Sequence, residues 1–552
     1  MNNPPATGGR DDTTRYLCAA AHLDQTFADD AIREFLVEPT RAVPPAPGVN
    51  APAVLAEAVA ARARRKVRDA TLVALAVVAL VFASWLFLGL WAVVAVGATI
   101  PAAKSEGWVS TVKRLAPLVA VVAIGVAAYL FVGESVTSVA DAGSDAEAVA
   151  GIVLSIVAII GVFVVLLVDE FVVANHINTR FRRGRTVGDV VVRPDQRPVL
   201  TFAAKRFLTQ LGRHLRGPAE PMAPGRTPAQ GGDGGGRAPA PVVVSRGFNP
   251  FVGAGEPHKP WSFAVPLKPV SNEPAKPLTA AVLYGRIYAA VVALRSSAYL
   301  SPGRRFAELN VTEQIVVSAE ELIDHDATAR DFLADHTVPP YPWLRGERVW
   351  QLRDDPQEWA RYYLCFQVET WDRDFVVSIY VHLAVSADTL YVEWTPCVLL
   401  PIRAWYRRID AMPMSLWSTV VQSLAGLAAL PVTLPRRFAG LFSRIRPLPR
   451  QRGVISADMF GVLWSLRERA ADSDVHNYFQ RADLDRYVKV LESRFTLAII
   501  AVLKDAGYSV AGLEQRVEAV ENNNLFINNS GNVAIGGRAN RVGNVTKTGT
   551  AS

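Results

Sequence analysis

The chain has 552 residues, 50% of them hydrophobic, and its formal net charge at pH 7 is +7. This length excludes a single ordinary domain, which contains about 150 residues. The three cysteines lie far apart and match neither a CxxC motif nor a zinc-ligand spacing, which argues against a disulfide framework and against a zinc–cysteine site.

Residues 1–60 are predicted to form cytoplasmic helices followed by a proline-rich linker. Apolar residues recur at helical spacing from Leu17 to Phe35, and Pro39 ends the pattern. The linker contains the sequence PPAPG at residues 44–48. We expect these helices to have a structural packing role.

Three uncharged apolar runs in residues 61–175 predict a multipass α-helical membrane anchor. About 20 apolar residues cross a bilayer, so the runs at 115–133 and 149–168 each fit one span. The run at 70–103 is long for one upright helix, and we interpret it as two short helices that turn near Gly89. The four predicted spans are 70–87, 88–103, 115–133 and 149–168, and the alternative is three spans with one long tilted helix at 70–103.

Flanking charge predicts an even number of crossings, because Lys and Arg are retained on the cytoplasmic side of a membrane. The loop at 134–148 has acidic residues but no Lys or Arg, so we expect it outside. The basic residues that set this topology are Arg62, Arg64, Arg65, Lys66, Arg68, Lys113, Arg114, Arg180, Arg182 and Arg183. They predict an inner-membrane protein with both termini in the cytoplasm.

Asp169 and Glu170 stand at the inner end of the last predicted span. Carboxylates at membrane depth are candidates for ion or proton handling. The predicted spans contain no other charged residue that could complete a relay, so we expect this pair in the headgroup region. A transporter or channel is therefore the least favoured function.

The sequence predicts a basic stretch and a proline- and glycine-rich linker at residues 176–241. It predicts a cytoplasmic α+β domain at residues 242–412. A helix is expected over 278–297 and a strand over 306–317. The strongest strand patterns are RYYLCFQVETW, DFVVSIYVHLAV and DTLYVEWTPCVLL, and the short turns between them predict an antiparallel meander. The glycine- and aromatic-rich loop at 247–263 is interpreted as a structural loop, with ligand binding as the alternative.

Residues 413–454 predict basic amphipathic helices that lie in the membrane interface, attracted by anionic lipids. The alternative is an ordinary helix pair packed on the α+β domain. The residues expected at the membrane surface are Trp417, Arg436, Arg437, Phe438, Phe442, Arg444 and Arg446. Residues 455–521 predict a C-terminal helical segment in which Gly507 ends the clearest helix.

Residues 522–552 form an Asn- and Gly-rich polar tail. Aliphatic residues recur at alternate positions between Asn and Gly, a spacing that suits stacked β-arcs. The core NVAIGGRAN resembles the short amyloid signalling motifs of the RIP homotypic interaction and HET-s-like kinds, which often terminate membrane-acting cell-death proteins. The resemblance implies that the tail nucleates, or receives, a β-fold from a partner with the same motif. The residues of this self-assembly motif are Leu525, Ile527, Asn532, Val533, Ile535, Gly536, Asn540, Val542 and Val545. The alternative is a solvated, disordered tail.

No sequence motif predicts catalysis, since the chain lacks HExxH, G-x-S-x-G and Walker patterns in the required context. We therefore predict a non-enzymatic membrane protein with no metal and no cofactor. Its expected partners are the lipid bilayer and a second copy or a partner with a similar tail, and no nucleic acid. The alternative function is a multipass membrane scaffold with an inert tail.

Overall fold

The computed structural model describes residues 12–82, 146–182, 239–442, 445 and 456–513. Short gaps within these ranges are residues 39, 45, 271–274, 325–328, 335–337, 372–373 and 412–415. The chain divides into two compact units, each built from segments that are distant in sequence. Unit 1, the helical unit, comprises 1–39, 48–217 and 405–451, and unit 2, the sheet unit, comprises 40–47, 218–404 and 452–552.

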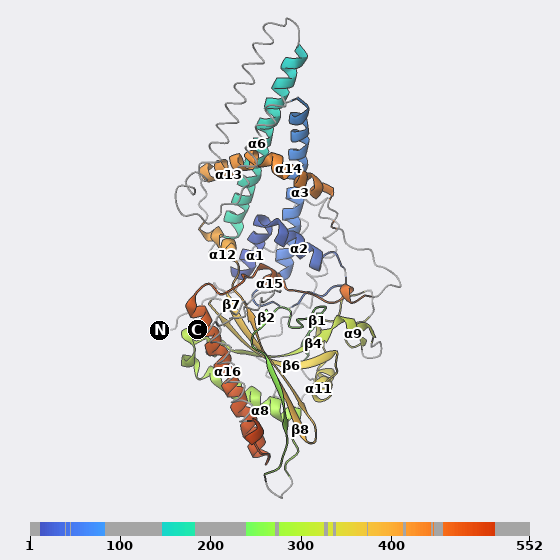
Figure 1. Ribbon diagram of the computed structural model, residues 1–552, viewed down its shortest axis with the longest axis vertical. Coiled ribbons are helices and arrows are strands. Elements are labelled where there is room, and N and C mark those ends of the chain that lie inside the picture. The colour runs from blue at the N-terminus through green and yellow to red at the C-terminus, as the bar shows by residue number, and fades with distance from the viewer. Residues whose placement is uncertain are drawn as a thin grey trace, which may run out of the picture. The chain divides into compact units, whose positions relative to one another are not determined.

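The helical unit is centred on two long helices, α3 (Ala51–Phe82) and α6 (Ala146–Arg180), which run side by side (Figure 1). The shorter helices of this unit are α1 (Asp12–Leu23), α2 (Gln25–Phe35), α12 (Ala404–Arg407), α13 (Leu416–Ala428) and α14 (Leu430–Phe442). Asp24 caps α2, because its carboxylate accepts hydrogen bonds from the N–H groups of Thr26 and Phe27. Helices α13 and α14 meet at a bend of 82°.

The predicted four-span anchor is wrong. In the part of the chain that the structure describes, one helix, Val153–Arg180, is long and apolar enough to cross a membrane. The bent pair α13–α14 would add a second candidate only if both helices are counted as one broken span. The described part of the apolar run that begins at Ala70, residues 70–82, continues α3 after Arg62 to Arg68, so no separate span starts at Ala70. The predicted spans 88–103 and 115–133 lie outside the described residues.

The sheet unit contains an eight-stranded mixed sheet with the order β2-β8-β7-β6-β4-β1-β5, and β3 also pairs with β8. The strands are β1 (Ala240–Ser245), β2 (Glu256–Pro257), β3 (Trp261–Pro266), β4 (Asn310–Ser318), β5 (Trp343–Leu344), β6 (Ala360–Thr370), β7 (Phe375–Val385) and β8 (Thr389–Leu399). Strands β6, β7 and β8 pair in order and antiparallel, so the predicted meander is confirmed. The parallel pairing of β1 with β4, from Val242 opposite Ile315 to Ser245 opposite Ser318, makes the sheet mixed.

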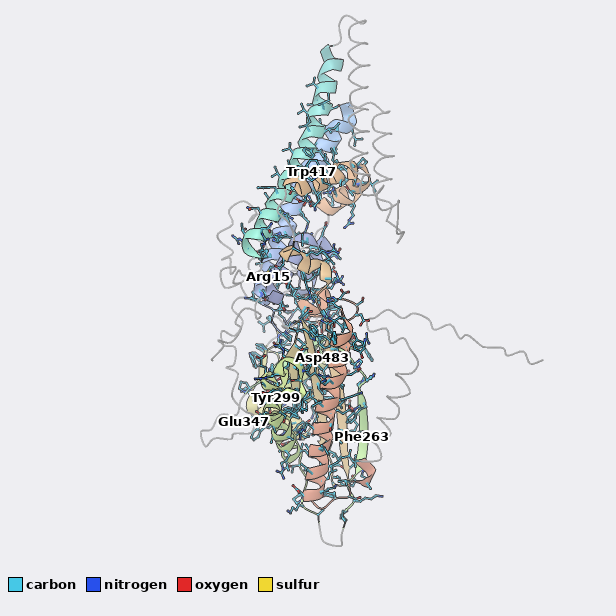
Figure 2. All side chains as sticks on the ribbon, turned by 90° about the vertical axis from the view of Figure 1, so that its left-hand side faces the viewer. Arg15, Phe263, Tyr299, Glu347, Trp417 and Asp483 are labelled. Carbon is cyan, nitrogen blue, oxygen red and sulfur yellow. The ribbon has the colours of Figure 1, made fainter. Side chains whose placement is uncertain are left out.

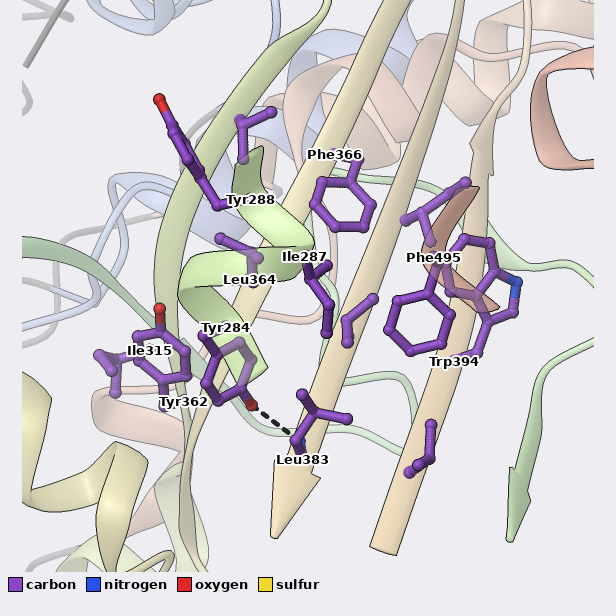
Figure 3. Packing of buried hydrophobic residues seen from close by; sticks show 14 of the residues in the cluster. Tyr284, Ile287, Tyr288, Ile315, Tyr362, Leu364, Phe366, Leu383, Trp394 and Phe495 are labelled. Atoms are coloured by element: carbon purple, nitrogen blue, oxygen red, sulfur yellow. Dashed lines mark hydrogen bonds between the residues drawn. The ribbon is translucent and has the colours of Figure 1, made fainter. Parts of the chain in front are cut away.

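Helices α8 (Ala280–Val292) and α16 (Tyr478–Asp505) pack against the meander and form the main core of the sheet unit (Figure 3). The Trp394 ring is fully buried, with its centroid 4.9 Å from that of Phe495 on α16. Tyr284 on α8 accepts a 2.7 Å hydrogen bond from the backbone N–H of Leu383. After α16 the chain turns at Gly507. Its φ of +83° is a backbone conformation that favours glycine.

The remaining helices of the sheet unit are short. They are α9 (Ala319–Asp324), α11 (Gly346–Asp354), α15 (Leu466–Ala470) and the 3₁₀ helices Ala293–Arg295, Ala298–Leu300, Pro302–Glu308 and Ala457–Met459. Ser465 and Glu468 form a reciprocal capping box at the start of α15. Glu468 of this capping box also forms hydrogen bonds with the glycine- and aromatic-rich loop on the second face of the sheet.

The glycine- and aromatic-rich loop packs on the second face of the sheet. Phe251 lies with its ring centroid 4.5 Å from Tyr380 and 5.2 Å from Tyr363. Gly255 has φ +89°, and a Cβ there would lie 2.0 Å from the carbonyl oxygen of Val398, so only glycine fits. Burial also raises the pKa of Cys365 on this face to about 12, so its thiol is protonated at neutral pH.

Glu468 connects this loop to α15. One carboxylate oxygen accepts hydrogen bonds of 2.8 Å from the N–H groups of both Gly253 and Gly255, and the other accepts from the N–H of Ser465. Burial raises the pKa of the Glu468 carboxyl, although these hydrogen bonds oppose the shift.

We expect Glu468→Ala to lower the free energy of unfolding by about 2 kcal/mol, because it leaves buried N–H donors without an acceptor. Denaturant unfolding of the full chain measures this change. The matched substitution Glu320→Ala removes an exposed carboxylate and should cost less than about 0.5 kcal/mol. Equal costs for the two variants would contradict the role assigned to Glu468.

Candidate functional site

Three helices of the helical unit bring two histidines to one buried carboxylate. His22 lies in the last turn of α1, Glu57 in α3 and His176 near the end of α6. The Nε2 atoms of His22 and His176 lie 2.8 Å and 3.1 Å from the same oxygen, Oε2 of Glu57. The two imidazole rings meet edge to face, with their centroids 4.7 Å apart. We call these three residues the His–Glu–His cluster.

The cluster is shielded from water on most sides. The side chains of Glu57 and His22 are 1% and 6% exposed, whereas that of His176 is 22% exposed. The ring of Phe181 lies against both imidazoles. Burial lowers the pKa of His22 to about 4, which outweighs the opposing hydrogen bond and charge of Glu57, so the His22 ring is neutral at pH 7.

A second polar group, the Arg–Asp cluster, joins α3, α6 and α14. Asp169 of α6 forms ion pairs with Arg68 at 2.9 Å and with Arg64 at 3.4 Å. Asp69 of α3 pairs with Arg68 at 2.9 Å and with Arg437 at 2.7 Å. Asp169 is only 9% exposed, so its charge is compensated by protein groups rather than by water.

The part of α6 that precedes Asp169 has an apolar outer surface. Its exposed side chains are Val153, Leu154, Val157, Ile160, Val164 and Val168, with exposed fractions between 42% and 57%. Only 28% of the most apolar segment of this helix is buried. On the opposite side of α6, Val162 and Leu166 pack against Leu72 of α3 and Leu427 of α13.

The basic residues that predicted the membrane topology are largely engaged within the helical unit. Arg62 forms an ion pair with Asp29, and Arg65 donates a hydrogen bond to the carbonyl of Ala21. Arg64 and Arg68 belong to the Arg–Asp cluster, and Lys66 and Arg180 also lie in the long helices. Lys113, Arg114 and Arg183 lie outside the described residues.

The residues predicted at the membrane surface divide into exposed and paired groups. Trp417, Phe438 and Phe442 are 68%, 51% and 62% exposed (Figure 2 labels Trp417), and Arg436 is exposed as well. Arg437 instead pairs with Asp69. Arg444, Arg446 and the whole self-assembly motif at 522–545 lie outside the part of the chain that the structure describes.

Sequence reasoning missed the His–Glu–His cluster entirely. Its members are separated by 35 and 119 positions, and no ligand motif has such spacing. One signal was available, because Glu57 is the only charged residue in the alanine-rich run APAVLAEAVAA at 51–61. A single carboxylate in such a run requires a buried partner.

The comparisons with known proteins identify a family and no individual relative. No curated protein and no solved structure matches this sequence. A family model described as AbeC-like domain matches residues 260–538, which is just over half of the 552 residues. The matched range includes strands β3 to β8, the helix pair α13–α14 and α16. The chain therefore belongs to the family defined by the AbeC-like domain.

Proposed function

We propose that this protein binds membranes through its helical unit and acts by interaction with partners rather than by catalysis. The observation that supports this proposal is the apolar outer surface of α6. A core helix of a water-soluble protein is mostly covered by its own chain, whereas this surface is uncovered among the described residues. Its apolar part, residues 149–168, is about 30 Å long at 1.5 Å per residue, which equals the hydrocarbon thickness of a bilayer.

Charge at the end of α6 supports one orientation. The Arg–Asp cluster begins at Asp169, directly after the apolar part, and Arg180 and Arg182 follow. Lys and Arg are retained on the cytoplasmic side. We therefore infer that the C-terminal end of α6 lies at the cytoplasmic surface of the inner membrane.

The position of helices α13 and α14, at the end of the apolar part of α6, suits the membrane interface. They lie across α3 and α6 (Figure 1), and Leu427 and Leu430 pack where the apolar part of α6 ends. Trp417, Phe438 and Phe442 stay exposed beside Arg436. Exposed aromatic rings beside arginine suit the boundary between acyl chains and anionic headgroups.

We expect Ile160→Arg to reduce membrane binding strongly, because an arginine at the centre of an apolar helix opposes insertion by about 3 kcal/mol. Flotation of the purified full chain with vesicles that contain anionic lipid measures the bound fraction. The control Leu497→Arg changes a similarly exposed residue of α16, at 56% exposure, and should float like the unsubstituted chain. Equal flotation of both variants would exclude α6 as the membrane-binding element.

A second proposal concerns the tail, where the alternation of aliphatic residues between Asn and Gly supports assembly with a partner that carries a similar motif. We expect a synthetic peptide of residues 520–550 to form fibrils that bind thioflavin-T. The same peptide with Val533→Pro and Ile535→Pro should remain monomeric, since proline cannot donate the hydrogen bonds of a β-ladder. If both peptides stay monomeric, the tail does not assemble by itself and this proposal is withdrawn.

A further inference from the structure

We propose that the His–Glu–His cluster binds one divalent transition-metal ion of the Zn²⁺ type, which links α1, α3 and α6. The inference concerns the helical unit only and does not depend on membrane binding. It starts from the convergence of two imidazole nitrogens and one carboxylate oxygen from three helices, all within 4.8 Å of one another.

Two of the three distances between the ligand atoms are close to the spacing of a metal site. Zinc binds imidazole nitrogen and carboxylate oxygen at about 2.0–2.1 Å, so ligand atoms at tetrahedral angles are about 3.3 Å apart. The two Nε2 atoms lie 2.8 Å and 3.1 Å from Oε2 of Glu57. These two distances would widen by a few tenths of an ångström around an ion, and all three ligand atoms lie within 4.8 Å of one another.

The donor set also matches the chemistry of these ions. Imidazole suits Zn²⁺, Cu²⁺, Fe²⁺ and Ni²⁺, and a carboxylate adds the negative charge that a dication requires. Ca²⁺ and Mg²⁺ prefer sites made of oxygen ligands only. We therefore assign a first-row transition metal to this cluster.

Glu57 is the central ligand of the proposed site. Its side chain is 1% exposed, and its Oε2 atom lies 2.8 Å from Nε2 of His22 and 3.1 Å from Nε2 of His176. An ion bound by these three residues would therefore hold α1 to the two long helices.

One polar atom distinguishes the cluster from a fully satisfied hydrogen-bond network. Nδ1 of His22 is buried and has no hydrogen-bond partner among the described residues. In the neutral ring Nε2 carries the proton and donates to Oε2 of Glu57, so an ion would bind Nε2 once this proton has moved to Nδ1. His176 is the most exposed member of the cluster, so it is the ligand nearest to water.

The test uses the full chain in detergent, with any affinity tag removed and metal stripped by a chelator. Co²⁺ and Zn²⁺ are added, and bound metal per chain is measured after gel filtration. We expect about one tightly bound ion per chain, and affinity at least about 100-fold weaker in His22→Gln, Glu57→Gln and His176→Gln, since loss of an outer-shell partner alone costs 10–100-fold. The control His476→Gln alters an exposed histidine–aspartate pair and should bind like the unsubstituted chain.

The unsubstituted chain alone tests whether the cluster binds a metal ion, even where a variant does not fold. Co²⁺ in a site with histidine nitrogens and fewer than six ligands absorbs visible light strongly, so an absorption band that saturates at one equivalent supports the proposal. Absence of this band together with no retained Zn²⁺ would overturn it. Binding that persists in all three cluster variants would also overturn it, because the ion would then be adventitious.

Discussion

Trp394→Ala is expected to lower the free energy of unfolding of the sheet unit by about 3–5 kcal/mol. Trp394 lies fully buried on β8, the last strand of the meander, where it packs against Phe495 of α16 and Trp261 of β3. Truncation to alanine removes these contacts with two elements at once and leaves a cavity. Denaturant unfolding of the full chain, followed by near-ultraviolet circular dichroism, measures the loss.

Two further variants separate packing from other effects of this substitution. Trp394→Phe keeps an aromatic ring and removes an indole N–H that has no hydrogen-bond partner among the described residues, so its cost should be less than half that of alanine. Phe248→Ala removes a fully exposed ring of the same unit and should change stability by less than about 0.5 kcal/mol. A cost for Trp394→Ala no larger than that of Phe248→Ala would rule out the described core.

Asp169→Asn is expected to destabilise the helical unit by about 3–5 kcal/mol, because it removes one partner of a buried ion-pair group and leaves positive charge uncompensated. Arg64 then loses its ion pair with Asp169, and Arg68 keeps its ion pair with Asp69. The side chains of Arg64 and Arg68 are 15% and 18% exposed, so water cannot replace the lost carboxylate well. Thermal unfolding of the full chain in detergent measures the effect.

The matched control is the same substitution at an exposed ion pair. Asp505 pairs with Arg286 at 2.7 Å, and both side chains are more than 60% exposed. Asp505→Asn should therefore cost less than about 1 kcal/mol. Equal destabilisation by the two substitutions would mean that Asp169 lies in water and that the Arg–Asp cluster does not form.

The meander could be predicted because its information is local. Alternating apolar residues in β6, β7 and β8 and the short turns between them specify antiparallel neighbours. The parallel pairing of β1 with β4 could not be predicted in the same way. The partner residues are more than 70 positions apart, and the connection includes β2 and β3, which pair with β8 at the other edge of the sheet.

The four-span prediction failed where hydropathy was used without reference to helix boundaries. The uncharged run beginning at Ala70 has the composition of a span, but it continues a helix that starts at Ala51 and carries paired arginines. The apolar run at 149–168 predicted an apolar helix of spanning length, and α6 is such a helix. The His–Glu–His cluster depends on packing among three helices, and no single segment contains that information.

The helical unit has a consequence for the order of events during synthesis. Its first helices precede the sheet unit in the chain, whereas α13 and α14 follow it. Arg437 is 368 residues after its partner Asp69. At 5–20 residues per second, a ribosome needs about 20–70 s to cover that distance. During this interval Asp69 has not yet formed its ion pair with Arg437, and the apolar surface that Leu427 and Leu430 later cover is still exposed. The nascent chain is therefore most prone to misassembly and to chaperone binding in this period.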